Sequence, residues 1–132
     1  LTYALRPSLR VALGGCYASG PGFGSSVGLQ WMHRWERFHL LVSPRADLRT
    51  RTALELMAQV EYTPRPGDRS GPYARLQVMV NGGPEHHNRS YRYLRVGWAL
   101  GASRFGLALN LDNYGPCACE RTNVGVFLRQ VL

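Results

Sequence analysis

The chain has 132 residues, enough for one domain and too few for two, so residues 1–132 are taken as a single domain. Hydrophobic residues make up 45%, which excludes a disordered tail. The longest apolar runs are about five residues, as at 124–128, whereas a membrane helix needs roughly 20, so a helical span is excluded. Sixteen basic residues, all of them Arg, stand against eight acids and give a net charge of +8.

Apolar and polar residues alternate with period two from Leu1 to Ala18, which is typical of a β-strand and does not fit a helix. The alternation returns in further segments separated by turns or by Gly- and Pro-rich loops such as 19–26, 63–72 and 113–121. The segments predicted to be strands are 1–18, 27–32, 38–49, 54–62, 75–81, 94–101, 105–112 and 124–132. Eight strands with short connections predict an all-β, antiparallel, up-and-down sheet that closes into a barrel, because closure removes the edge strands.

The composition of the two faces predicts which one lies inside the barrel. A soluble barrel buries its leucines, whereas a transmembrane barrel turns them towards lipid and keeps a polar interior. The face opposite the leucines is rich in small residues, which suit the crowded interior of a narrow barrel. We therefore expect the apolar set to contact lipid and the polar set to point inward. The apolar set is Leu9, Val11, Leu56, Val78, Val96, Trp98, Leu107 and Leu109, and the polar set is Arg10, Gln59, Gln77 and Arg95.

Aromatic residues near strand ends fit the girdles of a membrane barrel. They are Tyr3, Trp35, Tyr62, Tyr73, Tyr91, Phe105 and Tyr114. With its alternating segments, short turns and C-terminal strand, the whole chain resembles the small eight-stranded outer-membrane β-barrels, the class that includes the OmpA transmembrane domain and OmpX. The resemblance is one of pattern. It implies a transmembrane β-barrel in the bacterial outer membrane, in contact with lipid and lipopolysaccharide, without a cofactor. The chain departs from the class by ending in Val131 and Leu132 rather than in an aromatic residue.

Charges inside a barrel must pair, because an isolated buried charge costs several kcal/mol. Hairpin register places Glu61 opposite Arg75 and Glu55 beside Arg45, which predicts two interior ion pairs. Such pairs would fill a lumen too narrow to conduct; the alternative is a gated polar channel.

The segment 85–90 holds the densest set of residue types used in catalysis, with His86, His87 and Ser90 as candidates. Some barrels of the class are lipid-A-modifying hydrolases that use Ser, His and an acid, so the resemblance leaves a hydrolase as an alternative. No specific signature of those enzymes is present, and adjacent histidines rarely complete a metal site, so neither catalysis nor metal binding is expected here.

The three cysteines predict one disulfide in an oxidising envelope compartment. Barrel closure would bring Cys16 to the same rim as Cys117 and Cys119, so we expect Cys16 to pair with one of the two. A bridge between Cys117 and Cys119 is disfavoured because a single residue separates them; three free thiols is the alternative in a reducing compartment.

The function expected from the sequence is structural, as an accessory subunit of a larger envelope complex whose partners include other outer-membrane subunits. A soluble lipocalin-like ligand-binding barrel is a further alternative. The arginines are spread over the strands without a basic stripe, so nucleic acid is not an expected partner.

Overall fold

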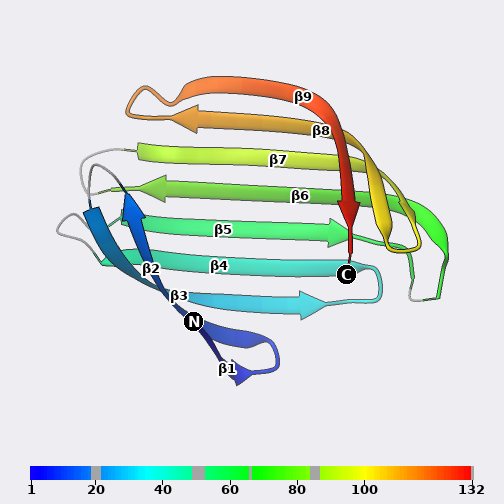
Figure 1. Ribbon diagram of the computed structural model, residues 1–132, viewed down its shortest axis with the longest axis horizontal. Coiled ribbons are helices and arrows are strands. Elements are labelled where there is room, and N and C mark those ends of the chain that lie inside the picture. Colours follow the sequence, from blue (N-terminus) through cyan, green and yellow to red (C-terminus); the bar gives the residue numbers. More distant parts are fainter. Residues whose placement is uncertain (19–21, 49–52, 66, 84–86, 132) are drawn as a thin grey trace.

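A computed structural model describes residues 1–18, 22–48, 53–65, 67–83 and 87–131, without the side chains of Cys16 and Ala18. All the regular structure in these ranges is β, and its strands form one sheet in the order of the sequence (Figure 1). The strands are β1 (Thr2–Arg6), β2 (Leu9–Ala18), β3 (Gly22–Arg34), β4 (Phe38–Leu48), β5 (Ala53–Tyr62), β6 (Ser70–Gly82), β7 (His87–Leu100), β8 (Ser103–Tyr114) and β9 (Cys119–Gln130).

Every strand pairs antiparallel with its neighbour in sequence, so the all-β, up-and-down order predicted from the alternation is confirmed. One end of the sheet, here called the turn end, carries the connections at 7–8, 35–37, 63–69 and 101–102. The other, the loop end, carries the remaining connections. Within the described ranges no helix is long and apolar enough to cross a membrane.

The sheet has nine strands rather than the eight predicted, because the segment 1–18 is a hairpin. β1 turns at Pro7 and Ser8 and pairs back onto β2, with Thr2 opposite Ala12 and Tyr3 opposite Val11. Arg6 stands opposite Leu9 at the turn, and the register shift between Ala4 and Arg6 then sets residues of equal parity opposite each other, so the period-two alternation continues unchanged from β1 into β2. The alternation alone consequently hides this hairpin.

The two faces of the sheet differ sharply in burial. The leucine face, made by the apolar residue of each alternating pair, is exposed: Val126 is 83% and Leu107 66% accessible. The buried side chains lie on the opposite, polar face. They are Tyr73, Met79, Ala99, Ala108 and Glu61.

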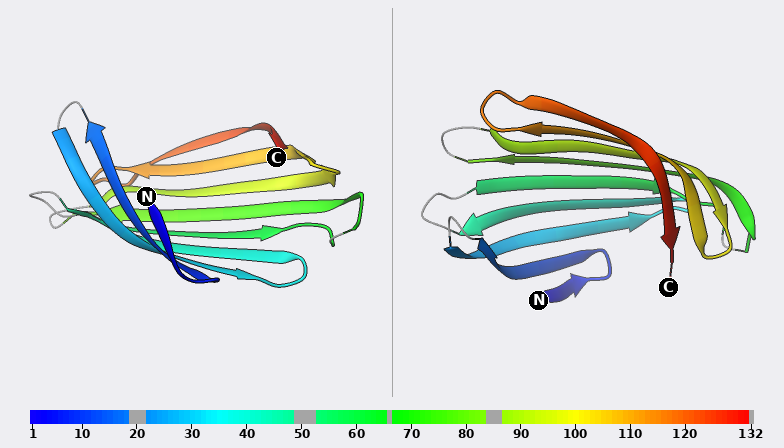
Figure 2. Two further views of the ribbon diagram at one scale, coloured as in Figure 1. Left: turned by 60° about the horizontal axis from the view of Figure 1, so that its bottom comes forward. Right: turned by 45° about the horizontal axis from the view of Figure 1, so that its top comes forward.

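The polar face is concave. Arg129 on β9 reaches the Glu61 carboxylate on β5 at 3.2 Å, although β6, β7 and β8 lie between them. In a flat sheet these strands would be about 19 Å apart, at the usual spacing between neighbours. The sheet must therefore curl around its polar face, and Figure 2 shows this curvature, with the end of β9 bending over it.

The sheet is open in this structure, whereas the sequence predicted a closed barrel. β1 forms one edge and β9 the other, and among the described residues they pair only with β2 and β8. β1 covers residues 9–12 of the outer edge of β2. Because the strands alternate in direction, β1 and β9 run the same way in the sheet, so they are not suited to antiparallel closure.

Candidate functional site

The leucine face holds the residues that the sequence assigned to lipid contact. Leu56, Val96, Trp98 and Leu107 are between 47% and 66% accessible. Leu9, Val11, Val78 and Leu109 are half-buried on the same face, through contacts with their neighbours in the sheet. The structure therefore contains no central leucine core in its described part, and the apolar surface points outward.

Aromatic side chains gather at the turn end of the leucine face. Phe38 and Tyr62 stand opposite each other with ring centres 5.1 Å apart, and Trp98 stands opposite Phe105. The Trp98 indole donates a hydrogen bond of 2.6 Å to Ser70. Aromatic rings with one polar end fit a membrane–water interface.

Three of the aromatics that the sequence placed with such girdles lie on the concave face instead. Tyr73, Tyr91 and Tyr114 share the parity of the polar residues in their strands, and Tyr73 is 2% accessible. Position near a strand end was the wrong criterion, because the pleat assigns each side chain to a face irrespective of its distance from the end.

The structure brings Arg45 and Glu55 together. They are directly opposite in β4 and β5, and Nη2 of Arg45 lies 3.2 Å from the Glu55 carboxylate. Asp47 and Asn81 extend this cluster, at 3.8 Å from Arg45 and 3.4 Å from Glu55. A local register prediction suffices for this pair because a short connection separates the strands.

Glu61 and Arg75 are also opposite in register, but in the described part of the chain the ion pair of Glu61 is with Arg129 rather than with Arg75. The Glu61 carboxylate accepts hydrogen bonds from Arg129, at 3.2 and 3.3 Å, and from Gln59, at 3.4 Å. Nη1 of Arg129 also donates to the Tyr73 hydroxyl at 3.3 Å. The curl of the sheet carries Arg129 over the carboxylate, while the buried Nε of Arg75 has no hydrogen-bond partner.

A second polar cluster lies on the concave face near the loop end. Arg89 donates to Asp112 at 2.8 Å and to the Tyr93 hydroxyl at 3.0 Å, and Tyr93 donates to Asp112 at 2.9 Å. The Arg89 guanidinium lies 5.4 Å from the ring centre of Tyr91 and 5.0 Å from that of Tyr114. The sequence placed Arg89 in a loop and missed this cluster; extending the period-two pattern of β7 back to position 87 would have found it.

The catalytic candidates do not form a site in the described part of the chain. His87 and Ser90 lie in β7 on either side of the register shift at Asn88, and among the described residues no hydrogen bond joins their side chains. Nδ1 of His87 donates to the Gly115 carbonyl at 3.0 Å. His86 lies outside the described residues. In the described ranges, no group of three or more His, Cys, Asp or Glu side chains could hold a metal ion.

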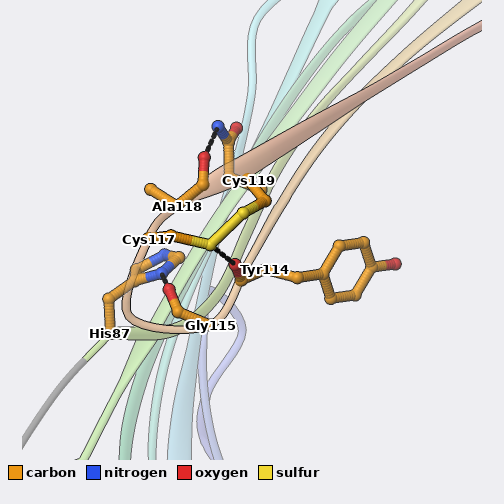
Figure 3. Close-up of a disulfide and its surroundings, with 7 residues drawn as sticks. His87, Tyr114, Gly115, Cys117, Ala118 and Cys119 are labelled. Carbon is orange, nitrogen blue, oxygen red and sulfur yellow. Dashed lines mark hydrogen bonds between the residues drawn. A yellow bond between two sulfur atoms is a disulfide. The ribbon is translucent and has the colours of Figure 1, made fainter.

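The connection between β8 and β9 carries a disulfide between Cys117 and Cys119, with Cα atoms 5.2 Å apart (Figure 3). The expected disulfide is confirmed, but it joins the pair that the sequence disfavoured. Ala118 between them adopts a φ of +47°, which lets the backbone turn back within one residue, and Asn113 donates to its carbonyl at 3.0 Å. The expected bridge from Cys16 depended on closure between the first and last strands, and these do not pair.

The chain was compared with protein-family models, curated proteins and solved structures, and no match was found in any of the three comparisons.

Proposed function

We propose that the protein is a structural β-barrel component of the bacterial outer membrane, with its leucine face against lipid and its polar face enclosed. One observation carries this proposal. The sheet exposes its large apolar side chains and buries Glu61 and Tyr73 on the concave side, which is the inverse of a water-soluble barrel.

The charges of the concave face support a structural role. The Arg45–Glu55, Arg89–Asp112 and Arg129–Glu61 pairs each join neighbouring or facing strands. Side chains tied in this way fill the space that a channel would need. The proposal is therefore a filled barrel that serves as a scaffold within a larger envelope complex.

In a bilayer the open edges would leave backbone groups without hydrogen bonds, and each such group costs several kcal/mol. The proposal therefore includes closure of the barrel by antiparallel pairing of β9 with β2, which gives the eight strands β2–β9. β1 would then leave the edge of β2 that it covers.

The outer face has an apolar hollow of about 950 Å³, where we expect lipid to bind. Its lining comes mostly from β2–β6, including Val11, Leu29, Leu54, Leu56 and Val80. A soluble ligand-binding barrel would need such a lining on the concave side. Lipid acyl chains would cover the hollow in the proposed orientation, and exposed arginines at the strand ends would meet lipopolysaccharide phosphates.

Quenching of tryptophan fluorescence by brominated acyl chains tests the proposal. The protein has three tryptophans: Trp31 and Trp98 on the leucine face, and Trp35 in a turn. We expect strong quenching after reconstitution into phosphatidylcholine vesicles brominated in the acyl chains, compared with vesicles that lack bromine. The variant Trp98→Phe should lose more of the quenching than the matched variant Trp35→Phe.

A protein that stays monomeric in buffer without detergent and shows no quenching would overturn the membrane proposal. No geometric observation favours the hydrolase alternative, since no hydrogen bond joins His87 and Ser90 in the described part of the chain.

A further inference from the structure

The turn-end half of the concave face carries more positive than negative charge. Six strands each place one arginine there, and among the described strand residues of this half Glu61 is the single carboxylate. The arginines are Arg10, Arg34, Arg75, Arg95, Arg104 and Arg129. Register sets Arg75 directly opposite Arg95, and Arg104 directly opposite Arg129. Like charges placed opposite each other on one face repel and favour a bound counter-ion.

The nearby carboxylates leave this excess uncompensated. Glu61 is occupied by Arg129. In the adjoining turns, Glu36 lies 4.0 Å from Arg65, and the Asp68 carboxylate accepts from the backbone N–H of Arg65 at 3.1 Å. Within the described residues, neither Arg75 nor Arg104 forms an ion pair.

Two guanidinium groups also have buried hydrogen-bond donors without a partner. Nε of Arg75 and Nε of Arg104 are both shielded from solvent and unbonded. A buried donor left in this way costs about 1–3 kcal/mol, and more when it is charged. Arg95, by contrast, donates to the backbone carbonyls of Leu94 and Leu109.

A cavity of about 420 Å³ opens at the turn end beside Arg104, whereas Arg75 and Arg95 are not part of its lining. Arg34, Arg104 and Arg129 line it from the strands, and Arg65 and Arg69 line it from the turn between β5 and β6. Three carboxylates, Glu36, Glu61 and Asp68, line it as well, so the five arginines of the lining outnumber them by two. Tyr73 connects two of the arginines, because Arg129 bonds its hydroxyl and the Arg104 guanidinium lies 6.0 Å from its ring centre.

We propose that this cavity is a binding site for a phosphate group. Several guanidinium groups around one cavity fit an anion with oxygens on all sides, because the planar fork of each binds two oxygens. Such a ligand would supply acceptors for the guanidinium groups that line the cavity and neutralise the facing Arg104 and Arg129. The group could belong to free phosphate or to a lipid or saccharide phosphate at the membrane surface. The site does not require membrane insertion, so its failure leaves the membrane proposal standing.

Isothermal titration of the full chain in a non-ionic detergent with inorganic phosphate, at constant ionic strength, tests the site. We expect saturable binding, and about tenfold weaker affinity in each of Arg34→Gln and Arg104→Gln, since both arginines line the cavity. Arg92→Gln removes the same charge from the exposed leucine face and should leave the affinity unchanged. Glu61→Gln should tighten binding, because it removes the competing carboxylate and frees Arg129.

Arg104→Lys keeps the charge but removes the fork, so an affinity between those of the wild type and Arg104→Gln is expected. This variant, checked for its β-sheet circular dichroism, separates loss of the site from loss of the fold. Competition with monomeric short-chain phosphatidic acid identifies the source: tighter binding than inorganic phosphate assigns a lipid headgroup, and equal or weaker binding assigns free phosphate. Absence of phosphate binding, or an equal effect of Arg92→Gln, would overturn the proposal.

Discussion

At the scale of single residues, two glycines set how closely β7 and β8 approach. Gly97 and Gly106 are register partners on the concave face, and Gly106 has a φ of +156°. A Cβ on Gly97 would overlap the Phe105 carbonyl oxygen and lie 2.7 Å from the Cα of Gly106. These are backbone atoms, which cannot rotate away, so the close approach requires glycine. It lies near the turn end, where these strands bend (Figure 1).

Gly97→Ala should therefore lower the free energy of unfolding by about 1–3 kcal/mol, the usual cost of forcing extra volume into a packed site. Gly125→Ala on the neighbouring strand is the matched control, because a Cβ there meets nothing within 4 Å. Its effect should stay within about 0.5 kcal/mol. Urea unfolding in detergent measures the free energy of unfolding of both variants. Equal destabilisation would show that the backbones of β7 and β8 leave room for a Cβ at position 97.

The contact between Glu61 and Arg129 fixes the curl of the sheet at the residue scale. A double-mutant cycle with Glu61→Gln and Arg129→Gln should give a coupling of up to about 1 kcal/mol, modest because the Arg129 side chain is 42% accessible. The cycle of Glu61 with Arg75 should give almost none. A larger coupling to Arg75 than to Arg129 would restore the pair predicted from register and contradict the curled geometry.

At the scale of the strands, the two edges of the sheet are formed by β1 and β9, each of which pairs with one neighbour in the described structure. β9 is 12 residues long and in the described structure pairs only with β8. Its outward side chains Val124, Val126 and Leu128 are 71–83% accessible, among the highest values on the leucine face, because no further strand flanks them. An unpaired edge of this length is a template for further pairing.

Hydrogen exchange of the β9 amides measures whether that edge is paired. In an antiparallel pair, alternate residues direct their N–H groups to the partner and the others direct them away. If the proposed closure forms in detergent, all amides of β9 should be protected. Rapid exchange at every second residue would instead describe a sheet that remains open.

At the scale of the whole molecule, the distribution of apolar surface is inverted relative to a soluble domain. Exposed apolar patches larger than a few hundred Å² mark interaction surfaces. Here every strand carries large apolar side chains that are exposed. The polar face, with its ion pairs and tyrosines, is the better-packed side. This distribution supports the proposal that the outer face contacts lipid.

Leu107→Arg tests this directly, since Leu107 lies in the middle of β8 on the outer face. In a bilayer the variant should be less stable by about 2–4 kcal/mol, the cost of arginine near the midplane of a membrane barrel. Ser103→Arg, at the strand end on the same face, should cost about 1 kcal/mol or less. Equal effects of the two variants in vesicles would argue against burial of Leu107 in lipid.

The sequence by itself determined the local features of this protein. Period-two alternation sets the strands, the composition of the two faces and, through short connections, the antiparallel order and the pairing of Arg45 with Glu55. The β1–β2 hairpin was not predicted because the bulge beside its turn preserves the alternation. The pairing of Cys117 with Cys119 was not predicted because it depends on the local backbone at Ala118. Arg129 meets Glu61 only because twist and curl accumulate over the strands from β5 to β9. Alternation describes the pleat of one strand and carries no information about that sum, so the tertiary structure alone decided it.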